Sequence, residues 1–390
     1  MLLPETAAHR RALADRLVAA GALRDPRWQA AVEAVPRELF LNPGVFLPAE
    51  GGRWRPVTAL GVAAGEWLDI AYSDRSLATQ LDCHLTADET ADLVSGIPTS
   101  SSTTPMTVVG MLEDLEVSDG QRVLEIGTGT GYSTALLCHR LGEDNVTTVE
   151  VDPQVAARAD AALEGAGFST WTVTGDGLVG HPPRAPYDRV IATCAVRRIP
   201  YAWIRQTKPG GIILATVGSW SYGTGLAKVV VNEEGAAQGR IIGCSAFMHA
   251  RSQSTALPAD LSARTAYADT KRLAKLPPTV LDEWTPAFLA QLAAPGTQLV
   301  SARAVNSSQQ LYLIDSNRES FATLAEDDTG GWVVRQGGPV ALWDVIEQAL
   351  IAWLDAGEPE LSEVSLRISK ACHTYTMGKG RTLRWDHYVQ

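Results

Sequence analysis

The sequence has little of what marks secreted, membrane or nucleic-acid-binding proteins. Its 5 cysteines are scattered and form no C-x-x-C pair, so we expect reduced thiols in a cytoplasmic protein. No apolar run approaches the roughly 20 residues that span a bilayer, and the amino terminus lacks the apolar core of a signal peptide. Lys and Arg number 33 against 44 Asp and Glu, a net charge of -11. This balance argues against a nucleic-acid partner and leaves a peptide partner open.

Metal ligands and repeats are scarce as well. Cys83 and His84 adjoin, but no further ligands are spaced to complete a metal site, so we expect none. No internal repeat is evident. What the chain does have is length and apolar content: 390 residues suggest two domains, and 45% apolar residues supply ample core. The oligomeric state stays open.

Three alternating glycines, Gly127, Gly129 and Gly131, interrupt an apolar run and are followed by a helical pattern. A glycine-rich loop of this kind lets the backbone approach a ligand closely. An acid about 20 residues further on, here Glu150, can hold the two hydroxyls of a ribose. The spacing G-x-G-x-G differs from the dinucleotide pattern G-x-G-x-x-G and suits a nucleoside without a pyrophosphate. Glu125, just before the loop, suits a cationic cofactor. The pattern favours S-adenosylmethionine over NAD, although a glycine loop alone also serves tight turns.

Further acids and glycines follow the ends of other predicted strands, as this loop does. Gly175, Asp176 and Gly177 follow a strand-like stretch at 170–173, where an acid can meet an adenine amino group. Residues 186–193 and 208–214 supply further strands, so the polar residues fall at the carboxyl ends of strands, where open α/β sheets bind ligands. The expected cofactor-binding residues are Glu125, Gly127, Thr128, Gly129, Gly131, Glu150, Val151, Gly175, Asp176, Gly177 and Thr193.

We expect a doubly wound, Rossmann-like α/β sheet, with a helical and loop cap before it and a second, α+β domain after it. Residues 1–98 form the amino-terminal part, with helices over 5–20 and 26–35 and with loops and short strands over 42–98 that cover the site. Residues 99–250 form the core, closed by a strand pair at 226–231 and 240–248. A polar segment at 253–275 precedes residues 276–390, where we expect strands at 309–314, 331–334 and 361–368 and a helix over 340–356.

A run of hydroxyl residues precedes Pro105. Such a run is often only a helix cap, and that interpretation stands beside a catalytic one. In a doubly wound arrangement the run lies over the carboxyl ends of the strands and faces the cofactor. We expect Thr103, helped by Ser102 or Ser101, to hydrogen-bond a substrate carboxylate and to aim it at a methyl group.

The sequence resembles the protein-L-isoaspartate O-methyltransferases. The resemblance rests on a PR-x-x-F element that begins at Pro36, the hydroxyl-x-Pro segment, the glycine loop, Glu150, and the segments 175–177, 185–188 and 208–211. It implies a class I methyltransferase fold, S-adenosylmethionine as cofactor with S-adenosylhomocysteine as product, and a protein or peptide carboxylate as acceptor. The family has Ser two residues before the proline, where this chain has Thr103. The stiffer χ1 of threonine can change substrate or rate.

The hydroxyl run and residues 191–203 also resemble a bacterial subfamily with a carboxyl-terminal extension, which accompanies ribosomally made, modified peptides of the graspetide and lanthipeptide classes. That resemblance implies methylation of an ordinary Asp in a precursor peptide, whose ester then closes to an aspartimide, a succinimide. We expect the extension to dock the peptide, or else to serve as a dimerisation or stability module. Three alternative functions remain: repair of isoaspartyl residues, an inactive peptide-binding scaffold, and methylation of a small-molecule acid. The full cofactor set argues against the scaffold.

Overall fold

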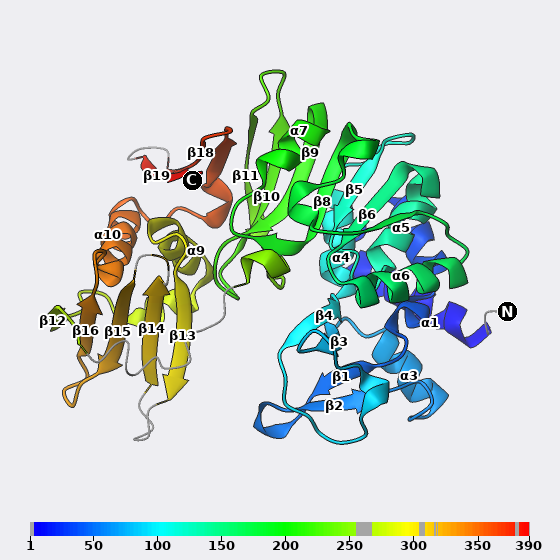
Figure 1. Ribbon diagram of the computed structural model, residues 1–390, viewed down its shortest axis with the longest axis horizontal. Helices are drawn as coiled ribbons and strands as arrows, with labels where there is room; N and C mark the ends of the chain where they lie inside the picture. Colours follow the sequence, from blue (N-terminus) through cyan, green and yellow to red (C-terminus); the bar gives the residue numbers. More distant parts are fainter. Residues whose placement is uncertain are drawn as a thin grey trace. The chain divides into compact units, whose positions relative to one another are not determined.

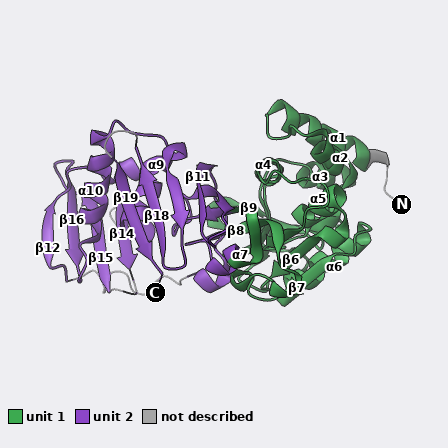
Figure 2. Ribbon diagram, turned by 90° about the horizontal axis from the view of Figure 1, so that it is seen from above, with its two compact units in different colours: residues 1–193, 205–214 green, residues 194–204, 215–390 purple. Residues whose placement is uncertain are grey.

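The computed structural model describes residues 4–254, 267–303, 309–315, 317, 319–378 and 382–389. Two compact units make up the chain, the first from residues 1–193 and 205–214 and the second from residues 194–204 and 215–390 (Figures 1 and 2). The expected separating segment at 253–275 lies mostly outside the described residues, and the expected domain boundaries stay a prediction.

Unit 1 is built on a parallel sheet. Strands β5 (Val123–Ile126), β6 (Val146–Glu150), β7 (Trp171–Thr174) and β8 (Tyr187–Val196) pair in parallel in the order β8-β5-β6-β7, with β9 (Thr207–Val217) beside β8. Strands β5 and β6 are buried along their whole length, which is typical of strands covered on both faces. Helices α5 (Tyr132–Leu141) and α6 (Pro153–Gly165) both contact β6. The expected doubly wound α/β class is confirmed.

The strand order of this sheet defines where a ligand can bind. From β5 the chain moves outward through β6 and β7, and it then returns to place β8 on the other side of β5. Open α/β sheets bind ligands where the strand order reverses, outside the carboxyl ends of the strands. In unit 1 that point lies just beyond Ile126 of β5, which is in register with Ala192 of β8.

Residues 42–98, expected as loops and short strands, are organised into an antiparallel sheet. Strands β2 (Trp54–Val57), β1 (Val45–Pro48), β3 (Leu77–Leu81) and β4 (Pro98–Ser102) lie in that order and form what we call the covering sheet. Phe46, Ala78, Leu81 and Ala87 form a small buried core beneath it. The other elements of this part are α1 (Pro4–Ala19), α2 (Pro26–Ala34), the short 3-10 helix η1 (Arg37–Leu41), α3 (Ala64–Ala71) and α4 (Pro105–Asp114).

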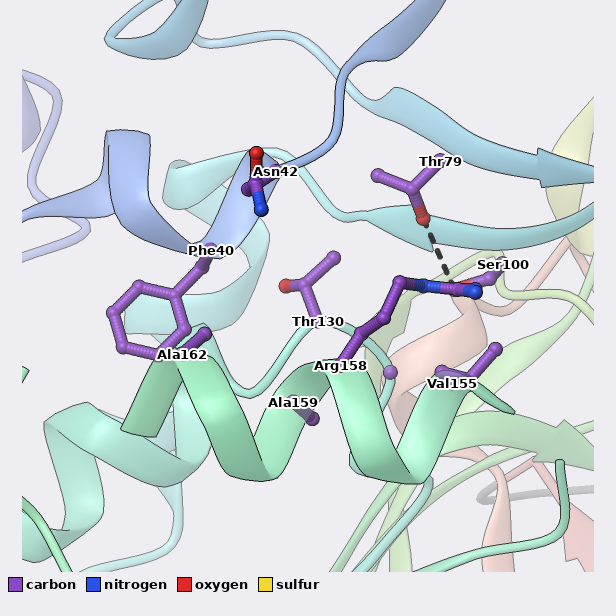
Figure 3. Close-up of a pocket in the computed structure, with 10 residues that line it drawn as sticks. Phe40, Asn42, Thr79, Ser100, Thr130, Val155, Arg158, Ala159 and Ala162 are labelled. Atoms are coloured by element: carbon purple, nitrogen blue, oxygen red, sulfur yellow. Dashed lines mark hydrogen bonds between the residues drawn. The ribbon is translucent and has the colours of Figure 1, made fainter. Parts of the chain in front are cut away.

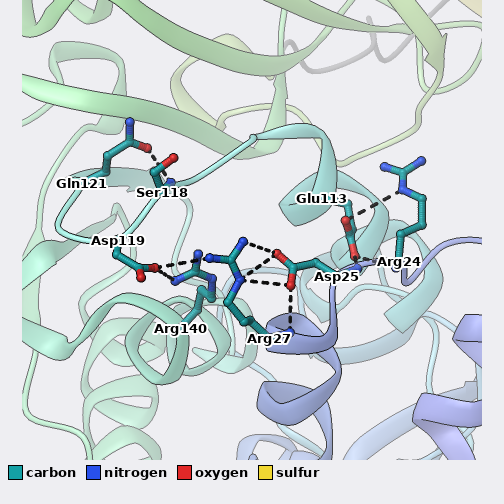
Figure 4. A network of polar contacts seen from close by, with 8 residues as sticks. All are labelled: Arg24, Asp25, Arg27, Glu113, Ser118, Asp119, Gln121 and Arg140. Carbon is teal, nitrogen blue, oxygen red and sulfur yellow. Dashed lines mark hydrogen bonds and ion pairs between the residues drawn. The ribbon is translucent and has the colours of Figure 1, made fainter.

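A polar network joins the first helices to α4 and α5 (Figure 4). Asp25 caps α2 by accepting the Arg27 amide at 2.8 Å, as an Asp-Pro helix start predicts. Glu113 of α4 accepts two backbone amides just before α2 at 2.6 and 2.7 Å. Arg27 also lies 3.6 Å from Asp119, which Arg140 of α5 contacts at 2.5 Å. Because α4 begins directly after the hydroxyl run, this network helps to fix the position of that run.

Unit 2 contains two antiparallel sets of strands. The first runs in the order β19 (Leu383–Tyr388), β18 (Cys372–Met377), β17 (Ser365–Ile368), β11 (Ala237–Cys244) and β10 (Gly225–Val231). The second runs in the order β12 (Thr270–Leu273), β16 (Trp332–Gly337), β15 (Ser320–Glu326), β14 (Gln309–Asp315) and β13 (Gln298–Arg303). Helices α9 (Trp284–Ala293) and α10 (Leu342–Asp355) contact each other.

The prediction of a strand at 361–368 in unit 2 is wrong for its first half. Leu361–Glu363 form a 3-10 turn, because the side chains of Glu360 and Glu363 cap it reciprocally, and only Ser365–Ile368 are extended. The strands expected at 309–314 and 331–334 and the helix over 340–356 agree with β14, β16 and α10 to within a few residues. Within the described ranges, no helix combines the length and the apolar character that crossing a bilayer demands.

Candidate active site

The glycine loop after β5 has a backbone that favours glycine at all three positions. Gly127, Gly129 and Gly131 have φ of 93°, 56° and 89°, in the left-handed region that L side chains rarely adopt. At Gly131 space is limiting too, since a Cβ there would lie 3.4 Å from the Cβ of Ala159 on α6. The loop therefore follows from its sequence, and it packs closely against α6.

Glu150 ends β6 with its carboxylate beneath the loop. Its Oε2 accepts the Gly129 amide at 2.9 Å, and its Oε1 accepts the Asp152 amide at 3.1 Å. A carboxylate oxygen has two lone pairs, so both oxygens can still accept a hydrogen bond from a ligand. The next residue, Val151, is exposed and offers an apolar surface beside this acid. This arrangement is the one the sequence predicts for holding a ribose next to a base.

Glu125 does not lie where the sequence places it. We expected its carboxylate near a cationic cofactor, but the residue is 0% exposed. Its oxygens accept hydrogen bonds from the hydroxyls of Ser133, Thr134 and Thr148, the last at 2.8 Å. Burial raises the pKa of the Glu125 carboxyl, and the three hydroxyls oppose that shift. Its role is therefore to hold the start of α5 against β6 under the loop.

The hydroxyls of Thr128 and Thr193 are also used by the protein itself. The Thr128 hydroxyl lies 2.7 Å from that of Thr148, below the loop. The Thr193 hydroxyl donates to the carbonyls of Ile126 and Gly127, the first at 3.1 Å. These two residues brace the loop from beneath and from β8, so any cofactor contact they make is through the loop they support.

Residues 175–177 follow β7 and turn toward the same point. The Gly175 amide donates to the Glu150 carbonyl at 2.8 Å. Asp176 is exposed and its Oδ1 accepts the Leu178 amide at 2.9 Å, which leaves its other oxygen facing outward. A Cβ on Gly177 would lie 2.5 Å from Cγ2 of Ile126. Glycine is needed there so that the turn carrying Asp176 can pack against the end of β5.

The hydroxyl run is a strand rather than a helix cap. Residues up to Ser102 belong to β4, and Thr104, which precedes α4, makes no side-chain capping bond. The run also meets the glycine loop, because the Ser101 carbonyl oxygen lies 3.7 Å from where a Cβ on Gly129 would be. Alternation along the strand buries Ser100 and Ser102 and leaves Ser101 and Thr103 half-buried.

The hydroxyls of this run differ in the hydrogen bonds that they make. Ser100 accepts from Thr79 at 3.1 Å, and Ser102 accepts from Arg37 at 3.3 Å. Among the residues that the structure describes, the Ser101 and Thr103 hydroxyls have no partner. Thr103 and Ser101 therefore remain candidates for substrate contact, whereas Ser102 supports the fold.

Arg37 is a supporting residue that the sequence does not reveal as such. It is 0% exposed, and its guanidinium donates to the carbonyls of Ala71 and Ser73 at 2.5 and 2.9 Å and to that of Thr103 at 3.3 Å. Burial lowers the pKa of Arg37 to about 10, so it stays cationic near neutral pH. The only sequence signal for it is the Pro-Arg pair after α2.

A shallow recess opens beside the glycine loop (Figure 3). It encloses about 270 Å³, part of it open to solvent, and Gly129 and Thr130 of the loop line it with Arg158 of α6. Thr79 and Ser100 of the covering sheet line its other side. The covering sheet and α6 therefore face each other across the glycine loop.

A family model for protein-L-isoaspartate(D-aspartate) O-methyltransferase matches residues 73–254. A protein-L-isoaspartate O-methyltransferase of Ignicoccus hospitalis is 41% identical over 133 residues, 34% of this chain and 63% of its own length. One of Anaeromyxobacter dehalogenans is 40% identical over 162 residues, 41% of this chain and 76% of its own length.

A solved structure described as a protein-L-isoaspartate O-methyltransferase has a similar fold. It covers 97% of this chain and 99% of its own, with a TM-score of 0.52 and 19% sequence identity. A fold of this extent, with strands beyond the methyltransferase core, is thus not peculiar to this chain.

Proposed function

Since this chain belongs to the protein-L-isoaspartate O-methyltransferase family, we propose that it esterifies the free α-carboxylate of isoaspartyl residues in peptides and proteins. As a member of the family it is an S-adenosylmethionine-dependent carboxyl O-methyltransferase. The single observation that supports the proposed substrate is a pair of hydroxyls that have no partner among the described residues: that of Ser101, on β4 beside the glycine loop, and that of Thr103, just after this strand.

The described residues fit a nucleoside cofactor at the end of β5 and β6. Glu150 would accept the two ribose hydroxyls with its remaining lone pairs. The positive-φ backbone of Gly127 and Gly129 leaves no side chain between the loop and the ligand. Val151 would lie along the adenine, and the outer oxygen of Asp176 would accept from the adenine amino group. When bound, S-adenosylmethionine supplies an electrophilic methyl carbon.

Transfer to a carboxylate asks little acid–base chemistry of the protein. A carboxyl group is already ionised near neutral pH, so no general base is needed. Thr103 and Ser101 would donate hydrogen bonds to one carboxylate oxygen and hold the other in line with the methyl carbon and sulfur. The carboxylate oxygen would form its new bond to the methyl carbon as the bond from that carbon to sulfur breaks, and the electron pair would stay on sulfur. Catalysis of this kind rests on proximity and orientation.

The product ester is neutral and activated. The backbone nitrogen of the residue that follows in the peptide attacks it in a five-membered closure, which releases methanol and is favoured by high effective molarity. This step gives a succinimide and takes place within the peptide itself, so it requires no further residue of the enzyme.

Mass spectrometry of a synthetic isoaspartyl peptide tests the proposal. The wild-type protein with S-adenosylmethionine should add one methyl group to the isoaspartyl peptide and none to its Asp counterpart. Thr103→Ser keeps the hydroxyl and should stay active, whereas Thr103→Val removes it at equal size and should lower kcat about 10- to 100-fold. Equal activity of Thr103→Val and wild type would show that this hydroxyl does not orient the carboxylate.

A second candidate substrate is an ordinary Asp of a modified ribosomal precursor peptide, which would give an aspartimide. One observation favours it: Thr103 stands where the family has Ser. The same assay separates the two candidates. Methyl gain followed by methanol loss on an Asp-containing, cross-linked precursor, with no reaction on linear isoaspartyl peptides, would favour peptide maturation.

We also propose that residues 276–390 contribute to peptide docking. Removing them is a poor test, because β17 pairs with β11 and truncation would leave β11 an open edge. Hydrogen–deuterium exchange of the whole chain with and without peptide is sounder. Protection of backbone amides in β13–β16 on adding peptide would support docking, and unchanged exchange there would instead favour a stabilising role.

A further inference from the structure

Gln80 of β3 occupies an unusual position between the covering sheet and the cofactor residues. It is 0% exposed, although glutamine is seldom fully buried. A buried amide has to be satisfied in all directions, because an unmet hydrogen bond inside the protein costs about 1–3 kcal/mol. The partners of Gln80 therefore tell what this position holds together.

Those partners come from two different parts of unit 1. The Gln80 Oε1 accepts from the hydroxyl of Thr99 on β4 at 2.9 Å. Its Nε2 donates to Oδ2 of Asp152 at 3.2 Å. Thr99 lies on the same strand as Ser101 and shortly before Thr103, whereas Asp152 caps α6 by accepting the Gln154 amide at 2.8 Å. One side chain thus joins the strand of the substrate hydroxyls to the start of α6.

The connection continues to the carboxylate proposed to hold the ribose. The Asp152 backbone amide donates to Glu150 Oε1 at 3.1 Å, and Glu150 Oε2 accepts the Gly129 amide at 2.9 Å. Hydrogen bonds therefore run without a break from Thr99 through Gln80 and Asp152 to Glu150 and the loop. All of these residues are in unit 1.

We propose that Gln80 is a positioning residue that couples cofactor binding to the placement of β4. Gln80 fixes Asp152, and through Asp152 it fixes the orientation of Glu150. In return, a ligand bound to Glu150 stabilises the position of β4, and with it the positions of Ser101 and Thr103. By linkage, the cofactor then raises affinity for the peptide by the same factor as the peptide raises affinity for the cofactor. The substrate half of this inference rests on the proposed function, whereas the cofactor half does not.

The decisive variant is Gln80→Leu, which keeps the size of the side chain and removes both hydrogen bonds. Gln29→Leu is the matched control, since Gln29 is half-buried on α2 and its side chain donates to Glu33, a residue of the same helix, at 2.9 Å. Calorimetry with S-adenosylhomocysteine should show Kd about tenfold higher in Gln80→Leu, the effect expected for one lost hydrogen bond to a charged group, and unchanged in Gln29→Leu. Melting temperatures of both variants measure any general loss of stability.

A second variant distinguishes positioning from simple packing. Gln80→Glu places a carboxylate against Asp152 at neutral pH and should weaken S-adenosylhomocysteine binding more than Gln80→Leu does. Lowering the pH protonates one of the pair and restores a donor, so affinity should recover relative to wild type at the same pH. If Gln80 only fills space, or if the substitution does not affect the cofactor site, S-adenosylhomocysteine affinity should show no such recovery at low pH.

Coupling itself is measured as the change in peptide Kd on adding S-adenosylhomocysteine. Wild type should show tighter peptide binding with the cofactor product, and Gln80→Leu should show a coupling factor near one. Unchanged cofactor affinity in Gln80→Leu, or a loss that only follows its melting temperature, would overturn the inference. If wild type binds the cofactor product but methylates no isoaspartyl peptide, the proposed substrate fails, and the cofactor measurements still decide the role of Gln80.

Discussion

The guanidinium of Arg37 donates to the carbonyl oxygen of Thr103 across 3.3 Å. The same side chain holds the carbonyls of Ala71 and Ser73 and the hydroxyl of Ser102. One fully buried cation thus gathers the backbone around Ser102 and Thr103. The position of Thr103 is therefore decided by a residue 66 positions earlier in the chain.

We predict that Arg37 is needed for turnover more than for cofactor affinity. Arg37→Lys keeps the charge but cannot reach the same acceptors, because an ammonium has three donors and no planar fork. Stability should fall by about 2–4 kcal/mol, the range for unmet buried polar groups, and kcat by about tenfold or more. Thermal melting and steady-state methylation assays measure both effects. Loss of S-adenosylhomocysteine affinity without loss of kcat would contradict this assignment.

Glu125 and Glu150 provide a matched pair of variants. Glu150→Gln alters a carboxylate that borders the loop, so S-adenosylhomocysteine Kd should rise about 10- to 100-fold, as for a lost charged hydrogen bond or two. Glu125→Gln alters an enclosed carboxylate and should change that Kd far less. Calorimetry on the two variants compares them directly. Equal losses of S-adenosylhomocysteine affinity in the two variants would indicate that Glu125 also binds the cofactor.

Glu125 should also affect how the stability of the protein depends on pH. Burial raises its pKa in the folded protein, so the folded state holds its proton more tightly than the unfolded state does. The contribution of Glu125 to the free energy of unfolding is fully present below the ordinary pKa of Glu, and it is lost as the pH rises through the pKa of Glu125 in the folded protein. Glu125→Gln should therefore gain stability relative to wild type from acid toward neutral pH. Glu164→Gln, an exposed position on α6, is the control and should show no such trend.

Sequence reasoning succeeded where local patterns carry the structure. The apolar runs of β5 and β6, the alternating glycines and the acid that ends β6 are all local, and the structure brings Gly129 and Glu150 together as predicted. It failed where function depends on partners far along the chain. The sequence cannot tell that Glu125 turns inward, that Ser102 is held by Arg37 or that Gln80 meets Asp152, since each depends on contacts made only in three dimensions.

The covering sheet illustrates the same limit. Residues 42–98 show little clean periodicity because β1–β4 are short and the pairing of β3 with β4 is irregular around Gln80. The hydroxyl run fits a helix cap as well as a strand until its neighbours are known. Pairing with β3 buries Ser100 and Ser102, while Ser101 and Thr103 stay half-buried.

Gly177 offers a test of how the turn after β7 packs against the end of β5. Gly177→Ala would bring its Cβ to 2.5 Å from Cγ2 of Ile126, and overpacking of this kind costs about 1–3 kcal/mol. Ile126→Leu moves the branch away from Cβ, so the double variant should recover part of the loss. A thermodynamic cycle from melting measurements gives the coupling. Additive losses in the double variant would show that Gly177 is not limited by Ile126.

His373 in unit 2 should make a further contribution to the pH dependence of stability. It is 2% exposed, and burial, with Arg198 nearby, lowers its pKa to about 4. The unfolded chain takes up a proton near pH 6.5, while the folded protein keeps His373 neutral until about pH 4. Stability should therefore decline between pH 6.5 and 4, and His373 should cause no further loss below that range, where both states are protonated.

The size of that decline follows from the difference in pKa. A shift from about 6.5 to about 4 corresponds to roughly 3 kcal/mol of unfolding free energy. His373→Gln removes the proton uptake, so its stability should be flatter across this range, although the side chain still has to fit a closed interior. Calorimetric melting at steps of pH measures the slope, with His84→Gln, at an exposed turn, as the control. A wild-type slope that survives in His373→Gln would assign the acid sensitivity to another group, and His387, whose pKa burial also lowers, would be the next histidine to replace.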